Sequence, residues 1–272
     1  MPIQGAPLIA EIMQQLQEQP QRLNVKFGKL RPGAEAQTVF IAVQDRDASK
    51  RWVASGTGFP VYFDGRIFIV TAAHNFRGMT DEPALLIGPN GYVRLFRDNF
   101  HLAGNTAIDI ALIAMNSDDL ITLFGECVCL QLDLDALPNR TEPYAYQAYG
   151  YPVSKNKHSK TQGWPMAGWR ITLGPAAPVP RRSKLNELGV PLLGFEIDLE
   201  RMVNDDGEPD RRIGKLEGIS GGPVVSHALG ENTVGPGMLA GVFLEWHSNE
   251  RVAVVMPAMA IKAAIRAWYP TS

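Results

Sequence analysis

The stretch GISGGP at residues 218–223 sets one serine among three glycines, just before an apolar run. Glycine adopts backbone angles that other residues resist, which favours a tight turn at this place. Such a turn can direct the backbone N–H groups of Gly218 and Ser220 to one point, where they would stabilise an oxyanion. The alternative is a glycine-rich turn that contains an incidental serine.

A second stretch, RIFIVTAAHNF at residues 66–76, is a nearly continuous apolar strand that ends in small residues and then presents His74. A histidine where a buried strand emerges can reach a cleft and exchange protons there. The other four histidines lack this setting, and His227, which follows a strand, is the one rival. The alternative is a histidine satisfied by hydrogen bonds in the core or at the surface.

The third stretch, NTAIDIALIAM at residues 105–115, holds Asp109 within an otherwise apolar strand. A buried carboxylate is costly unless it is paired or hydrogen-bonded. A histidine N–H is one natural partner, because the carboxylate then fixes the tautomer whose other nitrogen can take a serine proton. The alternative is an aspartate hydrogen-bonded to backbone in the first turn of the strand.

In chain order these stretches supply His, Asp and Ser. TAAH (71–74), DIAL (109–112) and GISGGP resemble the three active-site motifs of the chymotrypsin/trypsin-like serine peptidases. GTGF (56–59) is similar to the strand that precedes the histidine motif in that family. The resemblance extends over roughly residues 37 to 270 and is greatest to bacterial members that lack an appended peptide-binding domain.

The resemblance implies an all-β fold of two packed six-stranded antiparallel β-barrels with the active site between them. We expect an N-terminal extension at 1–36, a first barrel at 37–140 with His74 and Asp109, and a second at 141–272 with Ser220. It also implies a serine endopeptidase in which Ser220 attacks the peptide carbonyl, His74 acts as general base and then acid, and Asp109 orients the imidazole. Gly218 and Ser220 would donate the oxyanion-hole N–H groups.

Strand-like runs separated by turn signals agree with this architecture. Two helices flank them: an amphipathic one at 7–19, which either packs on the fold or docks a partner, and an alanine-rich one at 257–268. The basic, proline-rich segment 175–188 is predicted to be a solvated surface loop. The expected strands are 38–43, 57–63, 66–72, 84–88, 92–96, 109–115, 127–132, 144–150, 167–173, 192–199, 223–229, 238–246 and 252–256.

The sequence departs from the family pattern at Ile219, where secreted, zymogen-activated members carry an aspartate that pairs with a newly cleaved N-terminus. An isoleucine cannot form that salt bridge. Residues before Thr38 also show no obvious mature start. We therefore expect that N-terminal processing is not the activating step.

A second departure concerns substrate preference. By the family's spacing, the base of the primary pocket is Gly214, where trypsin has an aspartate, so this position does not support cleavage after Arg or Lys. The strand expected to line the pocket contains Leu244, Glu245 and Trp246. Glu245 could restore a basic preference and Trp246 could narrow the opening, unless these side chains point outward on an alternating strand.

Composition excludes several other classes. With 26 basic and 28 acidic side chains the net charge is -2, which does not favour nucleic acid as a partner. No signal peptide or apolar segment long enough to span a membrane is recognisable, and Cys127 and Cys129 are poorly placed for a mutual disulfide. We expect a cytoplasmic protein without metal or other cofactor, whose partners are a protein or peptide substrate and a possible regulatory protein.

Two other functions use the same residues. The scaffold could be a catalytically silent module that binds peptides or proteins, although degenerate members usually lose a triad residue. It could also keep the chemistry but change the acceptor, as an esterase or acyl transferase. A comparison of peptide and ester substrates separates these readings.

Overall fold

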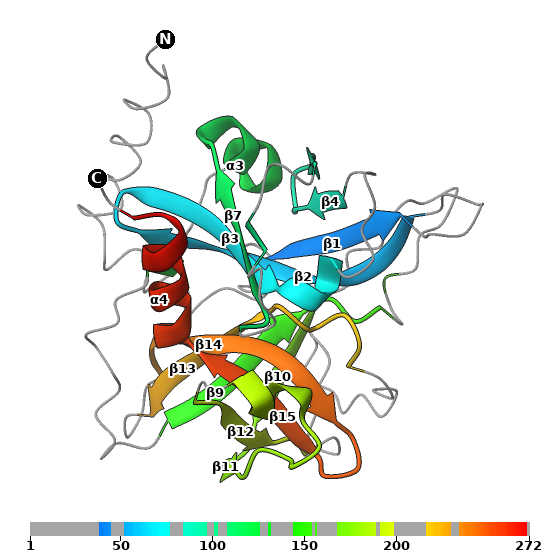
Figure 1. Cartoon of the computed structure of the whole chain (residues 1–272), viewed down its shortest axis with the longest axis vertical. Coiled ribbons are helices and arrows are strands. Elements are labelled where there is room, and N and C mark those ends of the chain that lie inside the picture. The colour runs from blue at the N-terminus through cyan, green and yellow to red at the C-terminus, as the bar shows by residue number, and fades with distance from the viewer. Residues whose placement is uncertain are drawn as a thin grey trace.

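The computed structural model describes most of two antiparallel sheets and two α-helices (Figure 1). The predicted N-terminal helix, Cys127, Cys129 and the predicted domain boundary at residue 140 lie outside the described residues. The residues that the structure describes are 38–44, 52–76, 84–96, 101–102, 108–125, 130–131, 144–153, 156, 168–188, 191–198, 216–229 and 234–270.

The first sheet has eight strands in the order β5-β4-β1-β2-β3-β7-β6, with β8 paired to β2. Every pair is antiparallel except β2 with β8. The strands are β1 (Val39–Gln44), β2 (Trp52–Phe63), β3 (Arg66–Ala72), β4 (Ala84–Ile87), β5 (Tyr92–Leu95), β6 (His101–Leu102), β7 (Ile110–Met115) and β8 (Leu130–Gln131).

The second sheet has seven antiparallel strands in the order β10-β9-β13-β14-β15-β12-β11. These are β9 (Tyr144–Gly150), β10 (Trp169–Leu173), β11 (Ala176–Ala177), β12 (Leu193–Glu196), β13 (Pro223–Leu229), β14 (Val234–His247) and β15 (Val252–Pro257). In the described part of the chain, each sheet thus contains six strands of four or more residues. The strands β6, β8 and β11, two residues each, account for the difference from the expected six per barrel.

The apolar runs that predicted strands are buried on both faces. Along β3, Ile67 and Ile69 enter the core of the first sheet, whereas Phe68 and Val70 enter a second core that the two sheets share. Along β15, Val255 lies in the core of the second sheet and Val254 and Met256 lie in the shared core. Successive side chains on a strand point to opposite faces, so a strand between two cores needs a continuous apolar run.

The helix α4 (Ala258–Trp268) closes one side of the shared core and stands beside both sheets in Figure 1. Ile261, Ala264 and Ile265 recur at helical spacing and pack into that core. Pro257, predicted to lie in the first turn, instead precedes the helix as its extended N-cap residue. None of the helices in the described residues combines the length and apolar character needed to cross a membrane.

Two local expectations need correction. The helix α3 (Ser117–Phe124) was not expected, although Asn116 caps it by accepting a hydrogen bond from the backbone N–H of Asp119 at 2.8 Å. The segment 175–188 is only partly a surface loop. Ser183 and Leu185 are buried at its 3₁₀ turn, η4 (Lys184–Leu188), while its basic side chains Arg181, Arg182 and Lys184 are exposed as expected.

Candidate active site

His74 and Asp109 meet because of the register between two neighbouring strands. Antiparallel β3 and β7 pair Ala72 with Ile110, so the residues just beyond the end of β3 lie opposite the residue just before β7. The chain then turns through the 3₁₀ helix η2 (Ala73–Phe76), which carries His74. The backbone N–H of His74 donates to Oδ1 of Asp109 at 2.9 Å.

The imidazole of His74 is held by the second carboxylate oxygen. Nδ1 of His74 lies 2.5 Å from Oδ2 of Asp109, whose carboxylate is buried. A carboxylate oxygen accepts, so the proton of a neutral imidazole is placed on Nδ1 and Nε2 is left as an acceptor. The burial cost of Asp109 is thereby offset by two donors, which also fix the ring orientation.

Ser220 lies in the turn that leads into β13, and two glycines with positive φ shape that turn. Gly218 has φ 95° and Gly221 has φ 88°, values that disfavour any residue with a side chain. A Cβ on Gly221 would also lie 2.2 Å from the carbonyl oxygen of Thr57 and 2.2 Å from Oγ1 of Thr71. Gly221 therefore allows the turn of the second sheet to approach the first sheet closely.

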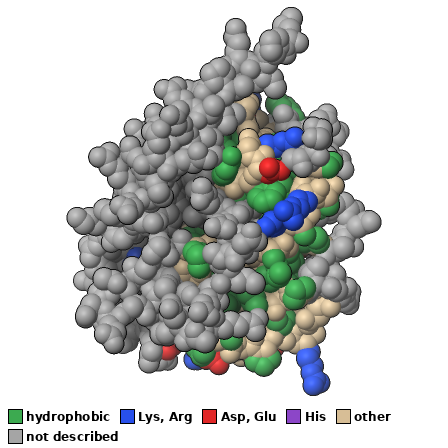
Figure 2. All heavy atoms as spheres, turned by 90° about the vertical axis from the view of Figure 1, so that its left-hand side faces the viewer, with side chains coloured by type: hydrophobic (Ala, Val, Ile, Leu, Met, Phe, Trp, Pro, Cys, Tyr) green, Lys and Arg blue, Asp and Glu red, His purple; other side chains and the backbone are tan. Residues whose placement is uncertain are grey.

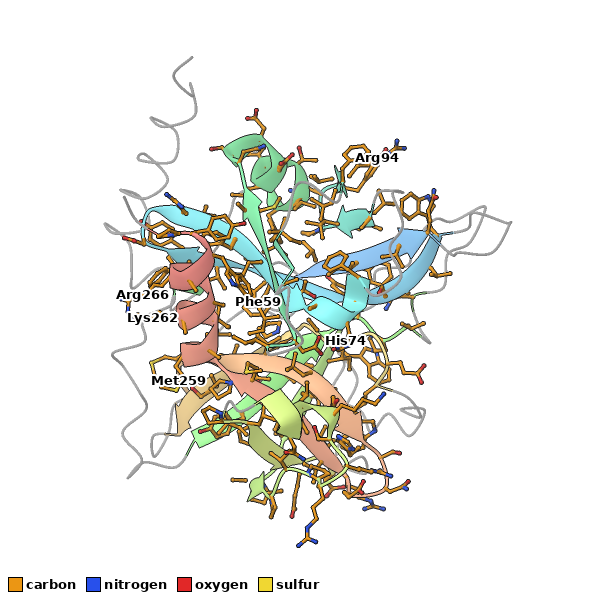
Figure 3. The ribbon with its side chains drawn as sticks, in the orientation of Figure 1. Phe59, His74, Arg94, Met259, Lys262 and Arg266 are labelled. Atoms are coloured by element: carbon orange, nitrogen blue, oxygen red, sulfur yellow. The ribbon has the colours of Figure 1, made fainter. Side chains whose placement is uncertain are left out.

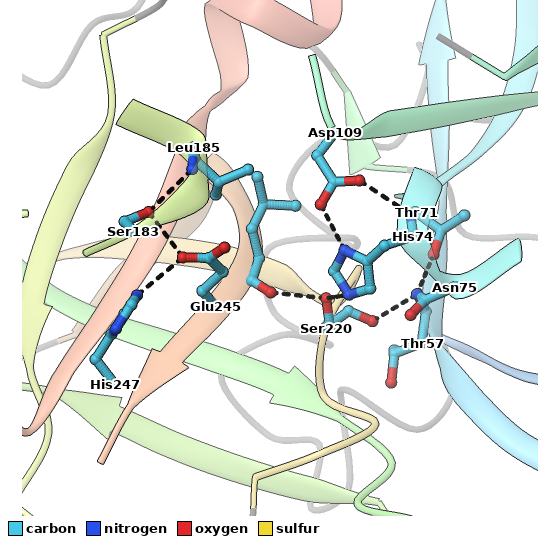
Figure 4. A network of polar contacts seen from close by, with 11 residues as sticks. Thr57, Thr71, His74, Asn75, Asp109, Ser183, Leu185, Ser220, Glu245 and His247 are labelled. Atoms are coloured by element: carbon cyan, nitrogen blue, oxygen red, sulfur yellow. Dashed lines mark hydrogen bonds and ion pairs between the residues drawn. The ribbon is translucent and has the colours of Figure 1, made fainter. Parts of the chain in front are cut away.

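The Ser220 hydroxyl faces the free nitrogen of the imidazole (Figure 4). Oγ of Ser220 lies 2.7 Å from Nε2 of His74 and 2.9 Å from the carbonyl oxygen of Leu244. A hydroxyl has one proton, so it donates to one of these acceptors at a time. Donation to His74 gives the hydrogen-bonded Asp–His–Ser chain that transfers a proton away from a nucleophilic oxygen.

The backbone beside Ser220 leaves donors for a developing oxyanion. The carbonyl of Glu217 accepts a hydrogen bond from the backbone N–H of Val153 at 2.7 Å. The C=O and N–H of one trans peptide point in opposite directions, so the N–H of Gly218 points away from Val153. Within the described residues, neither that N–H nor the N–H of Ser220 has a hydrogen-bond partner.

Thr57, in β2, was missed as a functional position by sequence reasoning. Its backbone N–H donates to the carbonyl of Ser220 at 2.9 Å, and its hydroxyl donates to the carbonyl of Gly218 at 2.7 Å. The same hydroxyl accepts from the backbone N–H of Tyr151 at 2.9 Å. A fully buried side chain of the first sheet thus fixes the serine turn of the second.

Asn75 was also missed. Its Nδ2 donates to the carbonyl of Ser220 at 2.9 Å and to Oγ1 of Thr71 at 3.0 Å. The only hint in the sequence was its place directly after His74. Thr71 is only four positions away, but Ser220 lies in the turn before β13 and 145 positions away, a distance that no local pattern encodes.

The residues expected to bind substrate are placed differently from one another. Gly214 lies outside the described residues. The Leu244 side chain is buried in the shared core, and only its carbonyl reaches Ser220. Trp246 packs against the core of the second sheet, and Glu245 accepts hydrogen bonds from Ser183 at 2.7 Å and from Nε2 of His247 at 2.8 Å.

A β-bulge in β14 explains why Leu244, Glu245 and Trp246 contact different parts of the protein. Strand β14 pairs with β15 through Phe243 and then Glu245, so Leu244 is an extra residue without a partner in the ladder. The bulge aims its carbonyl at Ser220. In the described residues, no group of three or more His, Cys, Asp or Glu side chains is arranged to hold a metal ion.

Comparisons with known proteins find similarity in structure alone. No protein-family model matches the sequence, and no curated protein matches it. A crystal structure of the Rv3671c protease from M. tuberculosis, in its active form, is 15% identical with a TM-score of 0.53, over 91% of this chain and 87% of that chain.

A second similar structure is the apo MamO protease domain from Magnetospirillum magneticum, which is 13% identical with a TM-score of 0.48, over 85% of this chain and 96% of that chain. At these identities the likeness to the M. tuberculosis protease concerns the fold. It agrees with the two curled antiparallel sheets of this chain. The chain therefore has the trypsin-like serine protease fold.

Proposed function

We propose that this protein is a serine endopeptidase that cleaves peptide bonds through an acyl-enzyme intermediate. The observation that carries the proposal is the chain of contacts from Asp109 through His74 to Ser220, with 2.5 Å and 2.7 Å between the interacting atoms. The structural similarity to the M. tuberculosis protease supports the fold, and at 15% identity the argument for the chemistry depends on this geometry.

In the first step, Oγ of Ser220 forms a bond to the peptide carbonyl carbon while its proton moves to Nε2 of His74. The carbonyl electron pair moves onto oxygen, where the N–H groups of Gly218 and Ser220 stabilise the charge. The electron pair returns, the C–N bond breaks, and the imidazolium donates its proton to the leaving amine.

In the second step, water attacks the acyl-enzyme ester. His74 takes a proton from this water, and a second tetrahedral oxyanion forms at the same N–H groups. When it collapses, the bond between the acyl carbon and Oγ of Ser220 breaks, and the proton on His74 returns to Oγ. The products are a new amine and a new carboxylic acid, which releases its proton to solvent, and the enzyme returns to its starting state.

We further propose that the serine turn is formed without cleavage of the N-terminus. Ile219, fully buried, packs in the core of the second sheet with Leu216 and Phe243. Apolar burial of this kind contributes about 2 kcal/mol and needs no ion pair. A variant truncated to begin at residue 37 should therefore be no more active than the full chain; a truncation that switched activity on would contradict the proposal.

A fluorophosphonate probe tests for an activated serine without knowledge of the substrate. We expect the wild type to be labelled at Ser220, as located by mass spectrometry, and Ser220→Ala and His74→Ala to lose the label. Ser248→Ala, at an exposed serine in the turn between β14 and β15, is the matched control and should be labelled like the wild type.

Unlabelled but folded wild type would contradict the proposal and indicate a silent binding module. If the wild type is labelled, a fresh sample that has not met the probe is given peptide libraries and matched ester substrates. Cleavage of peptides supports an endopeptidase. Turnover of esters with no peptide cleavage would replace that proposal with an esterase or acyl transferase.

A further inference from the structure

A cavity of about 490 Å³ lies between the β2–β3 hairpin and the C-terminal helix α4. None of its lining residues belongs to the Asp–His–Ser chain or to the bonds around Ser220. Its volume is within the range of about 300–1,000 Å³ that is usual for small-molecule sites. The lining residues are Phe63, Asp64, Arg66, Phe68, Lys262, Ile265, Arg266, Tyr269 and Pro270.

Three cations gather at this cavity. Lys262 and Arg266 are four residues apart on α4, which places them on one face of the helix (Figure 3). Both lie over the ring of Phe63, with Nζ of Lys262 at 5.9 Å and Cζ of Arg266 at 5.7 Å from its centroid. Arg66, at the start of β3, lines the same cavity from the hairpin.

Positive charge exceeds negative charge among the residues that line the cavity. Asp64 is the one acidic residue in the lining, so three cations and one anion leave a formal charge of +2. Neither Arg66 nor Arg266 has an ion pair within the residues that the structure describes. Two guanidinium groups without an ion pair in this part of the chain favour an added anion.

The floor of the cavity is apolar and aromatic. Phe68 and Ile265 are buried, and the rings of Phe68 and Tyr269 lie 4.9 Å apart at 56°. Burial raises the pKa of Tyr269, whereas a hydrogen bond with the backbone of Ala114 and the charge of Arg66 oppose that rise. The hydroxyl therefore stays protonated near neutral pH and adds no negative charge. Figure 2, which faces the side where α4 lies, shows basic side chains beside hydrophobic ones.

We propose that this cavity binds a phosphate monoester with an aromatic body. Such a group carries about -1.5 to -2 charges at neutral pH, which matches the local +2, whereas a carboxylate would balance half of it. Guanidinium groups donate two parallel hydrogen bonds to phosphate oxygens, and Arg66 and Arg266 supply two such groups. The aromatic body packs against the aromatic lining, of which Phe63 and Tyr269 are half-buried.

The test is calorimetric titration of the full chain with phenyl phosphate. We expect binding at least tenfold tighter than that of inorganic phosphate, which lacks the aromatic body, and no saturable binding of benzyl alcohol, which lacks the charge. Arg66→Gln and Arg266→Gln should each weaken binding about tenfold, because each removes one charge-assisted contact. Arg94→Gln, at an exposed arginine of β5, is the matched control and should bind like the wild type.

Thermal unfolding of each variant checks that the fold is intact, and the three substituted positions, Arg66, Arg94 and Arg266, are all exposed. Absence of saturable binding to folded wild type would overturn the proposal, as would equal weakening by Arg94→Gln. Equal affinity for inorganic phosphate would overturn the aromatic part. Adenosine monophosphate and phosphotyrosine are then compared, and the tighter of the two identifies a nucleotide or a phosphorylated tyrosine as the source of the group.

Discussion

The interface between the two sheets has an apolar half and a polar half, which have different roles. In the apolar half, side chains from both sheets and α4 form the shared core, with Phe59, Phe68 and Val242 among its members. In the polar half, Thr57 of β2 and Asn75 of η2 hydrogen-bond the turn that carries Ser220. Apolar packing is non-directional and stabilises; hydrogen bonds are directional and fix positions.

This difference predicts which substitutions should affect activity and which should affect stability. A buried polar group that loses its partner costs about 1–3 kcal/mol, and the geometry it held is released with it. A lost apolar contact costs stability in proportion to the area and cavity involved, while the polar half still positions Ser220. Substitutions in the two halves should therefore separate activity from stability.

The largest effect is expected at the carboxylate that orients His74. Asp109→Asn should lower the rate of fluorophosphonate labelling at Ser220 by about 10⁴-fold, because the amide favours the wrong imidazole tautomer. The folded state should persist, since the amide can still hydrogen-bond. Asp64→Asn, at an exposed carboxylate in the β2–β3 turn, is the control and should be labelled at the wild-type rate. Wild-type labelling of Asp109→Asn would show that this contact is structural only.

The next effect is on stability and belongs to the apolar half. Phe59, labelled in Figure 3, is fully buried in the shared core and lies two residues after Thr57 of the polar half. Phe59→Ala should lower the free energy of unfolding by about 3–5 kcal/mol, measured by denaturant titration. Phe59→Leu, which keeps most of the volume, should cost under about 1.5 kcal/mol. Loss of labelling in Phe59→Ala while it remains folded would contradict the separation of the two halves.

A smaller effect is expected at Thr57, the centre of the polar half. Thr57→Val keeps the shape but leaves the N–H of Tyr151 and the carbonyl of Gly218 without their partner. We expect a loss of about 2 kcal/mol in unfolding free energy and roughly tenfold slower labelling of Ser220. Thr57→Ser keeps the hydroxyl and should restore the labelling rate. Equal labelling in the valine and serine variants would mean that the hydroxyl does not position the turn.

The catalytic candidates could be predicted from the sequence, whereas Thr57 could not. His74, Asp109 and Ser220 each lie in a short stretch whose local pattern is unusual, so three consecutive motifs predict which side chains meet. The long apolar runs predict strands because both faces of each strand are buried. Thr57 escaped notice because its partner Gly218 is 161 positions away and the contact is to backbone.

Other features were missed for local reasons. The helix α3 has a polar start, with Asn116 as cap and Asp118 and Asp119 in its first turn, and this resembles the surrounding loops more than an apolar repeat. Ser183 lies within a run of charged and proline residues that indicates a loop. Its burial follows from its hydrogen bond to Glu245, a partner from β14 that the sequence of the loop does not reveal.

The smallest effect is expected for a polar contact outside the interface between the two sheets. Two adjacent residues, one exposed and one buried, allow the comparison. Arg182 pairs with Glu250 at the surface, where both side chains are exposed, whereas the next residue, Ser183, is buried and bonds Glu245. Exposed ion pairs contribute about 0–1 kcal/mol, because solvent screens them and two long side chains must be held in place. Arg182→Ala should therefore change the unfolding free energy by less than about 1 kcal/mol, and Ser183→Ala by more, in the same denaturant titration. If the two substitutions changed the unfolding free energy equally, burial would not determine how much a polar contact contributes to the stability of this protein. The distinction between buried and exposed polar contacts would then be wrong.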